Sequence, residues 1–164
     1  MSSERCSSLS DRADSSAMSG HIRVRLAERV DGARVSAFYA ARGREFNPTG
    51  EGVVLMAFAD ESDQHILGAV WLDQSNSSCV LRKMQVDPAW QGRGVGTALL
   101  HAAVTAGASA KIWCLPWRHL IGFYSKAGFA LVSPDSAPDH IASRLAKYMG
   151  WGLDIVLMKR EASE

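Results

Sequence analysis

The sequence predicts a mixed α/β (α+β) fold, in which helices flank a largely antiparallel central sheet. Two observations favour this class. In the first half, apolar runs of strand length are joined by short polar turns, which is typical of antiparallel pairs. In the second half, a strand, a glycine-rich turn, a helix and a further strand follow one another, which is typical of a βαβ unit with parallel strands.

The N-terminal half is expected to be mainly strand. Apolar and polar residues alternate over 22–26, which predicts a half-buried strand. Asp31 is expected to cap a helix that runs to about Arg42. A turn is expected at 47–50, and the polar segment 60–64 is expected to join a hairpin. The further strands predicted in this half are 53–58, 66–72 and 79–86.

The C-terminal half is expected to alternate helices with strands. One helix follows the glycine-rich turn, and a shorter one ends at Ala127-Gly128, a common helix terminus. The predicted helices are 97–105, 118–126 and 139–149. The predicted strands are 111–115, 129–132 and 154–158.

Length and composition indicate one globular domain. The chain has 164 residues, of which 47% are hydrophobic and 21% charged, as in ordinary globular proteins. Residues 1–20 contain many serines and charges but few large apolar side chains, so we expect a disordered tail before a single domain at 21–160. The formal net charge of +1 provides no overall field that would favour nucleic acid or a membrane as a partner.

The cysteines and the apolar runs exclude several other classes. Three cysteines without framework spacing argue against a secreted disulfide protein, and Cys79 and Cys114 are expected to be buried free thiols. No metal site is expected, because no Cys/His group has zinc spacing. A signal-peptide core and a run of transmembrane length are both missing, so we expect a cytoplasmic location.

The most informative segment is the glycine-rich turn at 91–97, which lies between a strand and a helix. Glycine allows tight turns and close approach of a ligand, and the start of a helix offers N–H groups and a positive dipole to phosphate. A Walker A loop would need Lys after Gly96, where Thr97 stands. A dinucleotide fingerprint would need a glycine at Thr97 and an acidic residue about 20 positions on, where Trp117 and Arg118 lie. A turn that binds no ligand is the remaining alternative.

The spacing Gln91-x-x-Gly94-x-Gly96 after Val-Asp-Pro resembles the acyl-CoA-binding motif of the GCN5-related N-acetyltransferases (GNAT family). The segment Phe123-Tyr124-Ser125-Lys126-Ala127-Gly128-Phe129 resembles a second signature of that family. Both motifs occur in the family's order, and the resemblance covers roughly 22–159. It implies a central sheet splayed in the middle and acetyl-CoA as cosubstrate.

The resemblance also implies roles for individual residues. Met84 and Val86 would lie on the central strand beside the pantetheine arm, and the Met84 N–H would polarise the thioester carbonyl. Tyr124 would protonate the thiolate leaving group, or else be a core tyrosine. Arg93 would add a cation, or else be a solvated loop residue. The residues whose N–H groups would surround the pyrophosphate are Gln91, Gly92, Arg93, Gly94, Val95, Gly96 and Thr97.

The sequence departs from the family pattern at two places. Trp117 stands where many members have an Asn. It is expected to line the acceptor pocket, to pack beneath the cofactor or, preferably, to pack in the core. The strand 79–86 carries no Glu or His as general base, so Asp73, Glu45, His119 or an ordered water are candidates. The segment 134–152 carries Arg144, Tyr148 and Trp151 and is either an acceptor-site wall or a solvated surface helix.

These features together predict an enzyme that transfers acetyl from acetyl-CoA to a primary amine by direct attack in a ternary complex. The acceptor, a small molecule or a protein amine, cannot be read from the sequence. A CoA-binding sensor or regulatory module without transfer activity is the alternative, and a nucleotide binder is a weaker one. A homodimer is possible by analogy with the family, and the sequence itself does not show the oligomeric state.

Overall fold

The computed structural model describes residues 21–46, 51–59 and 63–163. The predicted tail at 1–20, the turn at 47–50 and part of the polar segment at 60–64 lie outside these residues. The strands are β1 (Ile22–Leu26), β2 (Gly52–Ala59), β3 (Ile66–Asp73), β4 (Cys79–Val86), β5 (Ile112–Cys114), β6 (Ala130–Leu131) and β7 (Met158–Arg160). The helices are α2 (Gly32–Ala40), α3 (Val95–Ala106), α4 (Ile121–Ser125) and α5 (Asp139–Gly150).

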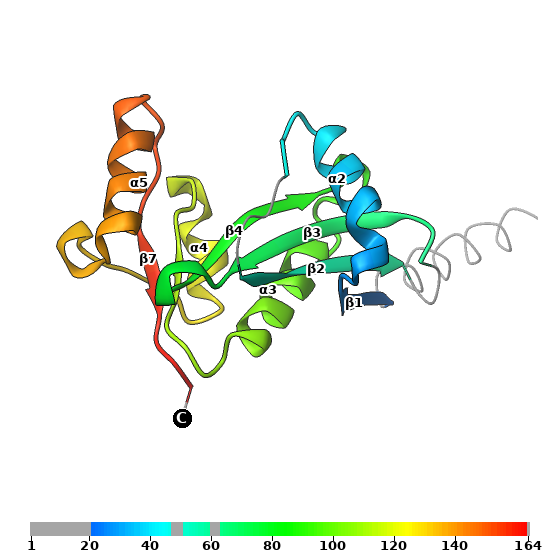
Figure 1. Ribbon diagram of the computed structural model, residues 1–164, viewed down its shortest axis with the longest axis horizontal. Helices are drawn as coiled ribbons and strands as arrows, with labels where there is room; N and C mark the ends of the chain where they lie inside the picture. The colour runs from blue at the N-terminus through cyan, green and yellow to red at the C-terminus, as the bar shows by residue number, and fades with distance from the viewer. Residues whose placement is uncertain (1–20, 47–50, 60–62, 164) are drawn as a thin grey trace, which may run out of the picture.

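The strands form a seven-stranded sheet in the order β1-β2-β3-β4-β5-β7-β6 (Figure 1). Among the described strands, β4 and β5 are the parallel pair and every other pairing is antiparallel. The predicted mixed, largely antiparallel fold is therefore confirmed. Parallel strands need a crossover connection, and α3 lies in the segment that connects β4 to β5.

Helices cover both faces of this sheet (Figure 1). On one face, α3 and α4 pack on side chains that include Leu55, Leu67 and Leu81. On the other, α2 packs on Phe58 in one cluster, and α5 packs on Val80 in a second. Neighbouring residues such as Val80 and Leu81 thus point to opposite faces, as strand geometry demands.

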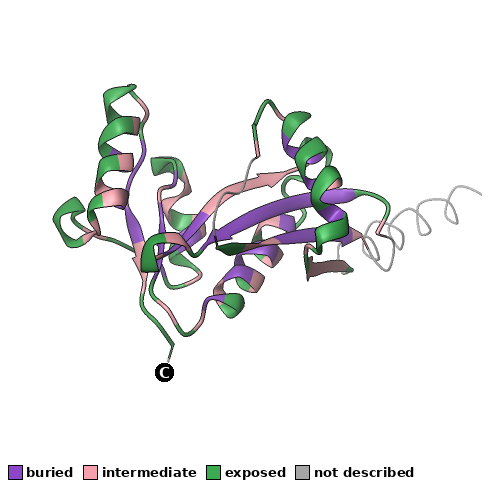
Figure 2. Ribbon diagram, viewed as in Figure 1, coloured by how far each residue is buried: buried purple, intermediate pink, exposed green. Residues whose placement is uncertain are grey.

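The central strand β3 explains the long apolar run from 66 to 72. Every residue of β3 is buried, and Figure 2 shows it enclosed between the helix layers. A strand covered on both faces reads as a continuous apolar run rather than as an alternation.

The final strand begins later than the sequence predicted. The strand expected at 154–158 lies at Met158–Arg160, where it pairs with β5 and β6. The residues before it are buried, but Ile155 makes only an isolated bridge with Trp117. The segment was predicted as a strand because its residues are apolar and buried, although they do not pair in the sheet.

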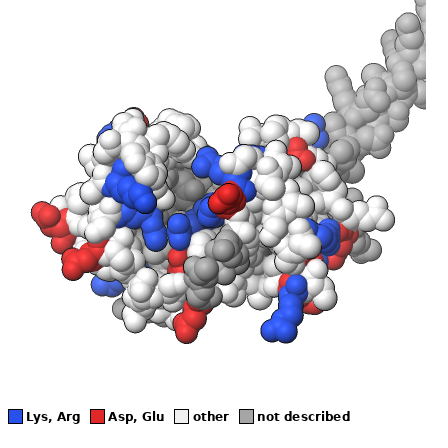
Figure 3. Space-filling view, turned by 45° about the horizontal axis from the view of Figure 1, so that its top comes forward, with Lys and Arg blue, Asp and Glu red and all other residues white. Residues whose placement is uncertain are grey.

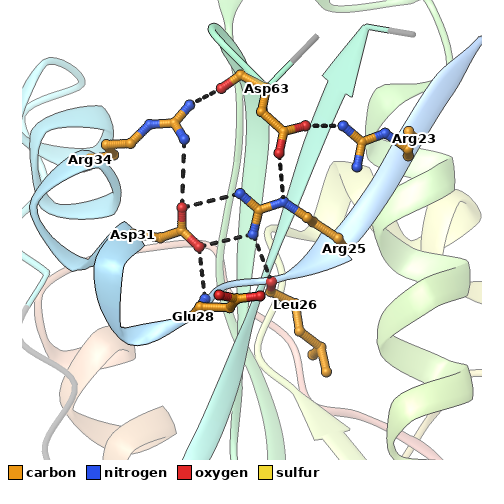
Figure 4. Close-up of polar contacts among 7 residues, drawn as sticks. All are labelled: Arg23, Arg25, Leu26, Glu28, Asp31, Arg34 and Asp63. Atoms are coloured by element: carbon orange, nitrogen blue, oxygen red, sulfur yellow. Dashed lines mark hydrogen bonds and ion pairs between the residues drawn. The ribbon is translucent and has the colours of Figure 1, made fainter. Parts of the chain in front are cut away.

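Asp31 does not cap α2 with its side chain, contrary to the prediction. Asp31 is buried, and its carboxylate accepts hydrogen bonds from Arg25 at 2.8 and 3.1 Å and from the Glu28 N–H at 2.7 Å. Arg25 also bonds Asp63 at 3.1 Å, and Arg34 bonds the Asp63 carbonyl (Figure 4). This network ties β1 and the start of α2 to the segment before β3.

Candidate functional site

The sheet opens between β4 and β5. Their parallel pairing covers Cys79 to Leu81 on β4 and Ile112 to Cys114 on β5, and it ends there. Beyond this point the second half of β4, Arg82–Val86, pairs only with β3 among the described strands. A pocket of about 320 Å³ lies at this opening, so the expected splay is present.

A β-bulge shapes the exposed part of β4. Trp71 pairs with Arg82 but Ala69 pairs with Gln85, so β4 has one extra residue here. Lys83 takes a left-handed φ of 54°, and its carbonyl accepts a 2.7 Å hydrogen bond from the Tyr39 hydroxyl. The bulge is therefore held by a buried contact from α2.

Met84 and Val86, the predicted strand residues, both lie on β4 past the bulge. Met84 lines the pocket, which fits its expected position next to a thioester. Val86 is not part of the pocket wall and packs instead against the cluster under α3.

The glycine-rich turn follows β4 directly. Asp87 accepts a 3.0 Å hydrogen bond from the Ala89 N–H and caps a short 3-10 turn. Gly92 and Gly94 then adopt left-handed φ values of 76° and 88°, which only glycine takes without strain. Gly94 is the N-cap of α3, so this helix begins two residues before its predicted start.

The predicted phosphate-binding residues lie together at the N-terminus of α3. The Ala98 N–H bonds the Gly94 carbonyl, so earlier N–H groups of the helix have no intrahelical acceptor. A Cβ at Gly92 would meet nothing within 4 Å, so a ligand has open access to the backbone there. The side chain of Arg93 stacks on Trp90 at 5.1 Å. The predicted residues in this group are Gln91, Gly92, Arg93, Gly94, Val95, Gly96 and Thr97. Exposed N–H groups and a helix dipole fit a pyrophosphate.

Tyr124 lies on α4 and reaches the same pocket. Its ring is fixed by edge contacts with Phe123 at 5.0 Å and Phe129 at 5.8 Å. Burial, with a smaller effect from nearby Cys114, raises the pKa of Tyr124 well above its usual range. The hydroxyl is therefore protonated and uncharged at pH 7.

Basic and aromatic side chains form the rest of the pocket wall. Arg144 and Tyr148 reach it from α5, so this helix borders the pocket and is not simply a solvated surface helix. Trp117 also lines the pocket and is 38% exposed, so the preferred expectation that it packs in the core is wrong. The residues that surround the pocket are Arg44, Val80, Leu81, Arg82, Lys83, Met84, Gln85, Cys114, Leu115, Pro116, Trp117, Leu120, Tyr124, Arg144, Tyr148, Trp151, Leu153 and Ile155.

The three side chains considered as general bases do not line the pocket. Asp73 is buried and accepts hydrogen bonds from Ser75 and, at 3.1 Å, from Arg82. Burial disfavours its charged form, but these hydrogen bonds prevail and lower its pKa. Glu45 and His119 are exposed. An ordered water is the remaining candidate.

The sequence alone did not single out Arg82 as a pocket residue, because its position depends on a strand pairing that the sequence does not display.

Cys79 and Cys114 are buried free thiols, as expected. The described residues include no group of three or more His, Cys, Asp or Glu side chains arranged to hold a metal ion. Among the described helices, none combines the length and the apolar character needed to cross a membrane.

Comparisons with known proteins agree with this geometry. Residues 51–131 match the sequence model of the acetyltransferase (GNAT) domain. A search of curated proteins finds no significant match to this sequence. The solved structures compared with this chain are 12–19% identical to it, so they show the fold alone.

Three of these structures illustrate the likeness. Rv2747 from Mycobacterium tuberculosis, in complex with CoA and NLQ, is 16% identical with a TM-score of 0.65, over 86% of this chain and 99% of that one. A GNAT-family acetyltransferase from Staphylococcus aureus Mu50 is 18% identical with a TM-score of 0.61, over 87% and 99%. N-acetylglutamate synthase from Neisseria gonorrhoeae, complexed with coenzyme A and N-acetyl-glutamate, is 19% identical with a TM-score of 0.60, over 87% of this chain and 35% of that one. This chain thus spans about a third of the synthase.

The domain match covers the splayed strand, the glycine-rich turn and the helix that carries Tyr124. With the fold and the pocket, it shows that the chain contains an acetyltransferase (GNAT) domain.

Proposed function

We propose that this protein transfers an acetyl group from acetyl-CoA to a primary amine, by direct attack of the amine within a ternary complex. One observation carries the proposal: Tyr124 and the half of β4 that has no partner on its β5 side line a single pocket, and the glycine-rich turn follows that strand after one short 3-10 turn. An activated acyl donor with a phosphate-bearing tail matches this arrangement.

The cofactor would be held by the backbone of two segments. Pyrophosphate would accept hydrogen bonds from N–H groups of the turn at 91–97. The extended pantetheine arm would pair with the open edge of β4, as peptides pair with sheet edges. When bound, acetyl-CoA supplies a thioester, which is an acetyl group already activated for transfer.

The residues of the chain would act on charge that develops during transfer. The Met84 N–H would stabilise negative charge on the carbonyl oxygen. Tyr124 would donate its phenolic proton to the departing sulfur as the carbon–sulfur bond breaks. The amine would lose its proton to water, because none of the carboxylates and imidazoles proposed as bases lines the pocket. Holding both substrates in one pocket would contribute much of the rate.

Release of CoA in the presence of a panel of amines tests the proposal. The panel should contain amino acids, polyamines, aminoglycosides and peptides with a free N-terminus. We expect acetyl-CoA turnover that depends on one class of amine and that ATP or NAD does not inhibit competitively. Binding of ATP or NAD but not of acetyl-CoA, with no turnover of any amine, would favour the nucleotide-binder alternative.

A CoA-binding sensor or regulatory module is a second candidate. It is favoured by the pocket wall, which contains no Asp, Glu or His among its described residues. The two candidates predict the same CoA affinity, and they differ in whether any amine is acetylated. A cytoplasmic location, a homodimer and the absence of nucleic-acid or membrane partners remain predictions.

A further inference from the structure

The pocket wall on the α5 side is strongly basic. Arg144 comes from α5, Arg82 and Lys83 from β4, and Arg44 from the segment after α2. Among the described residues that form the wall, none is an Asp or a Glu. Figure 3 shows Lys and Arg side chains gathered around a hollow in this face of the molecule.

Arg144 has an unsatisfied donor in this wall. Its Nη1 atom is buried, and no described residue accepts a hydrogen bond from it. Burial, followed by the nearby charge of Arg82, lowers the pKa of Arg144. A guanidinium nonetheless stays protonated, and a buried donor without an acceptor is costly. A ligand that brings a negatively charged acceptor to Arg144 would therefore bind favourably.

Arg82 stands next to Arg144 and is held from behind. Its guanidinium bonds Asp73 at 3.1 Å and lies over the Trp71 ring at 4.9 Å. Asp73 in turn accepts hydrogen bonds from the Ser75 N–H at 3.0 Å and the Ser75 hydroxyl at 2.6 Å. Asp73 fixes the position of Arg82, and its carboxylate is not part of the pocket wall.

The basic wall lies on the opposite face of the sheet from the cofactor-binding elements. Val80 packs in the cluster under α5, and Arg82, two residues on, contacts Trp71 and Asp73 on that same face. Leu81 packs instead in the cluster shared by α3 and Tyr124. The phosphates of the cofactor belong at the start of α3, so the arginines on the α5 face are available to the acceptor.

We infer that the acceptor is a small amine that also carries a carboxylate, and that Arg144 binds this carboxylate beside Arg82. A volume of about 320 Å³ suits a small molecule. Trp117, Tyr148 and Trp151 line the same pocket and would pack on the carbon skeleton of the acceptor. This inference rests on the proposed acetyltransferase function and names its substrate class.

Matched acceptors test the inference directly. Each of the common L-amino acids is compared with its carboxamide, which keeps the amine and removes the negative charge, and spermidine represents cationic amines. We expect kcat/KM to be about 30-fold or more higher for the preferred amino acid than for its carboxamide, since a charge-assisted contact is lost. O-phosphoethanolamine, compared with β-alanine, distinguishes a phosphate from a carboxylate. Preference for a carboxamide, for spermidine or for the phosphate compound would overturn the inference.

Substitution of Arg144 identifies the residue responsible. Arg144→Met should remove the preference for the carboxylate, with little change in kcat/KM for the carboxamide or in KM for acetyl-CoA. Arg144→Lys keeps a charge without the guanidinium fork and should retain part of the preference. Arg118→Gln is the matched control, because Arg118 pairs with Asp154 at 2.9 Å outside the pocket wall. An equal loss for both acceptors in Arg144→Lys and Arg144→Met would contradict the assignment.

A binding measurement separates failure of this inference from failure of the proposed function. If no amine is acetylated, the proposed activity is wrong. Calorimetry with CoA-saturated protein then compares the L-amino acids with their carboxamides. If an amino acid binds more tightly than its carboxamide, and Arg144→Met abolishes this difference, the anion-binding site is supported without the activity. If the two compounds bind equally, or neither binds detectably, the anion-binding site is overturned as well.

Discussion

The ring of Tyr124 packs against two other aromatic rings, so we expect that its hydroxyl can be removed without moving the ring. The aromatic contacts with Phe123 and Phe129 do not involve the oxygen. Tyr124→Phe should therefore keep the melting temperature and the KM for acetyl-CoA. It should lower kcat about 100-fold, the usual contribution of a general acid.

Because the pKa of Tyr124 is raised, the decrease in kcat caused by Tyr124→Phe should be equally large from pH 6 to pH 9. Steady-state kinetics of both proteins with one good acceptor provide the measurement. Full activity of Tyr124→Phe would show that the tyrosine is structural.

Asp31 makes stability depend on pH at the acidic end. Hydrogen bonds from Arg25, then from Glu28, lower the pKa of Asp31 from 3.8 to about 2. Because the folded-state pKa is depressed, the stabilisation is complete above about pH 4 and is lost as the pH falls towards 2. Asp31→Asn should thus lower the free energy of unfolding by about 2 kcal/mol at pH 6.

Urea denaturation of both proteins at pH 6, 4 and 2.5 measures this difference. The gap between them should narrow only below pH 4. Gly32→Ala serves as a control for mutation at this turn, because a Cβ there would meet nothing within 4 Å. A gap that stays constant down to pH 2.5 would contradict the role given to Asp31.

At the scale of elements, the glycines of the turn at 91–97 are expected to differ sharply. Gly94 has a φ of 88°, so Gly94→Ala should destabilise the fold by about 1 kcal/mol and weaken acetyl-CoA binding by displacing the N–H groups. Gly96 lies inside α3, and a Cβ there would meet Phe123 at 3.5 Å, an ordinary contact. Gly96→Ala should stabilise the fold by about 0.5 kcal/mol or more and keep the affinity within about threefold.

Thermal unfolding and calorimetry with acetyl-CoA check both variants. Equal effects of the two substitutions on affinity would show that the left-handed turn does not position the binding groups.

Elements were predictable where one physical signal dominated. The apolar run of β3 and the glycine-bounded start of α3 were visible in the sequence. The late start of β7 was not, because buried residues such as Ile155 resemble a strand whether or not they pair. The bulge at Lys83 was also invisible, since a lysine gives no sign of a left-handed φ that Tyr39 holds from another element.

The pocket was harder to predict than the cofactor-binding motif, because its residues come from elements that are far apart in the sequence. The motif is contiguous, whereas Arg82 and Arg144 meet only when β4 and α5 pack together. A charged residue on an amphipathic helix is usually solvated, so Arg144 carried no distinctive signal. The fold class and the glycine turn were thus accessible from local pattern, and the acceptor wall required the tertiary structure.

On the scale of the whole molecule, the sheet consists of two parts joined by the short β4–β5 pairing. Acetyl-CoA at about 100 times its dissociation constant should stabilise the fold by about 2.7 kcal/mol. It should also slow amide exchange in Arg82–Val86 and in the turn at 91–97, which the ligand would cover. Hydrogen–deuterium exchange with and without acetyl-CoA measures this change, and β2 provides an internal reference strand. Slowing confined to residues outside both segments would place the cofactor elsewhere.

The position of the pocket at a break in the sheet has a consequence for the order in which substrates bind. The start of α3 lies towards one face of the sheet and Arg144 towards the other. Two substrates that enter from opposite faces do not block one another, so either can bind first and either product can leave first. Initial-rate and product-inhibition patterns should therefore be those of random addition, with each substrate able to dissociate from the ternary complex. Strictly ordered kinetics would indicate that the first substrate builds part of the second site.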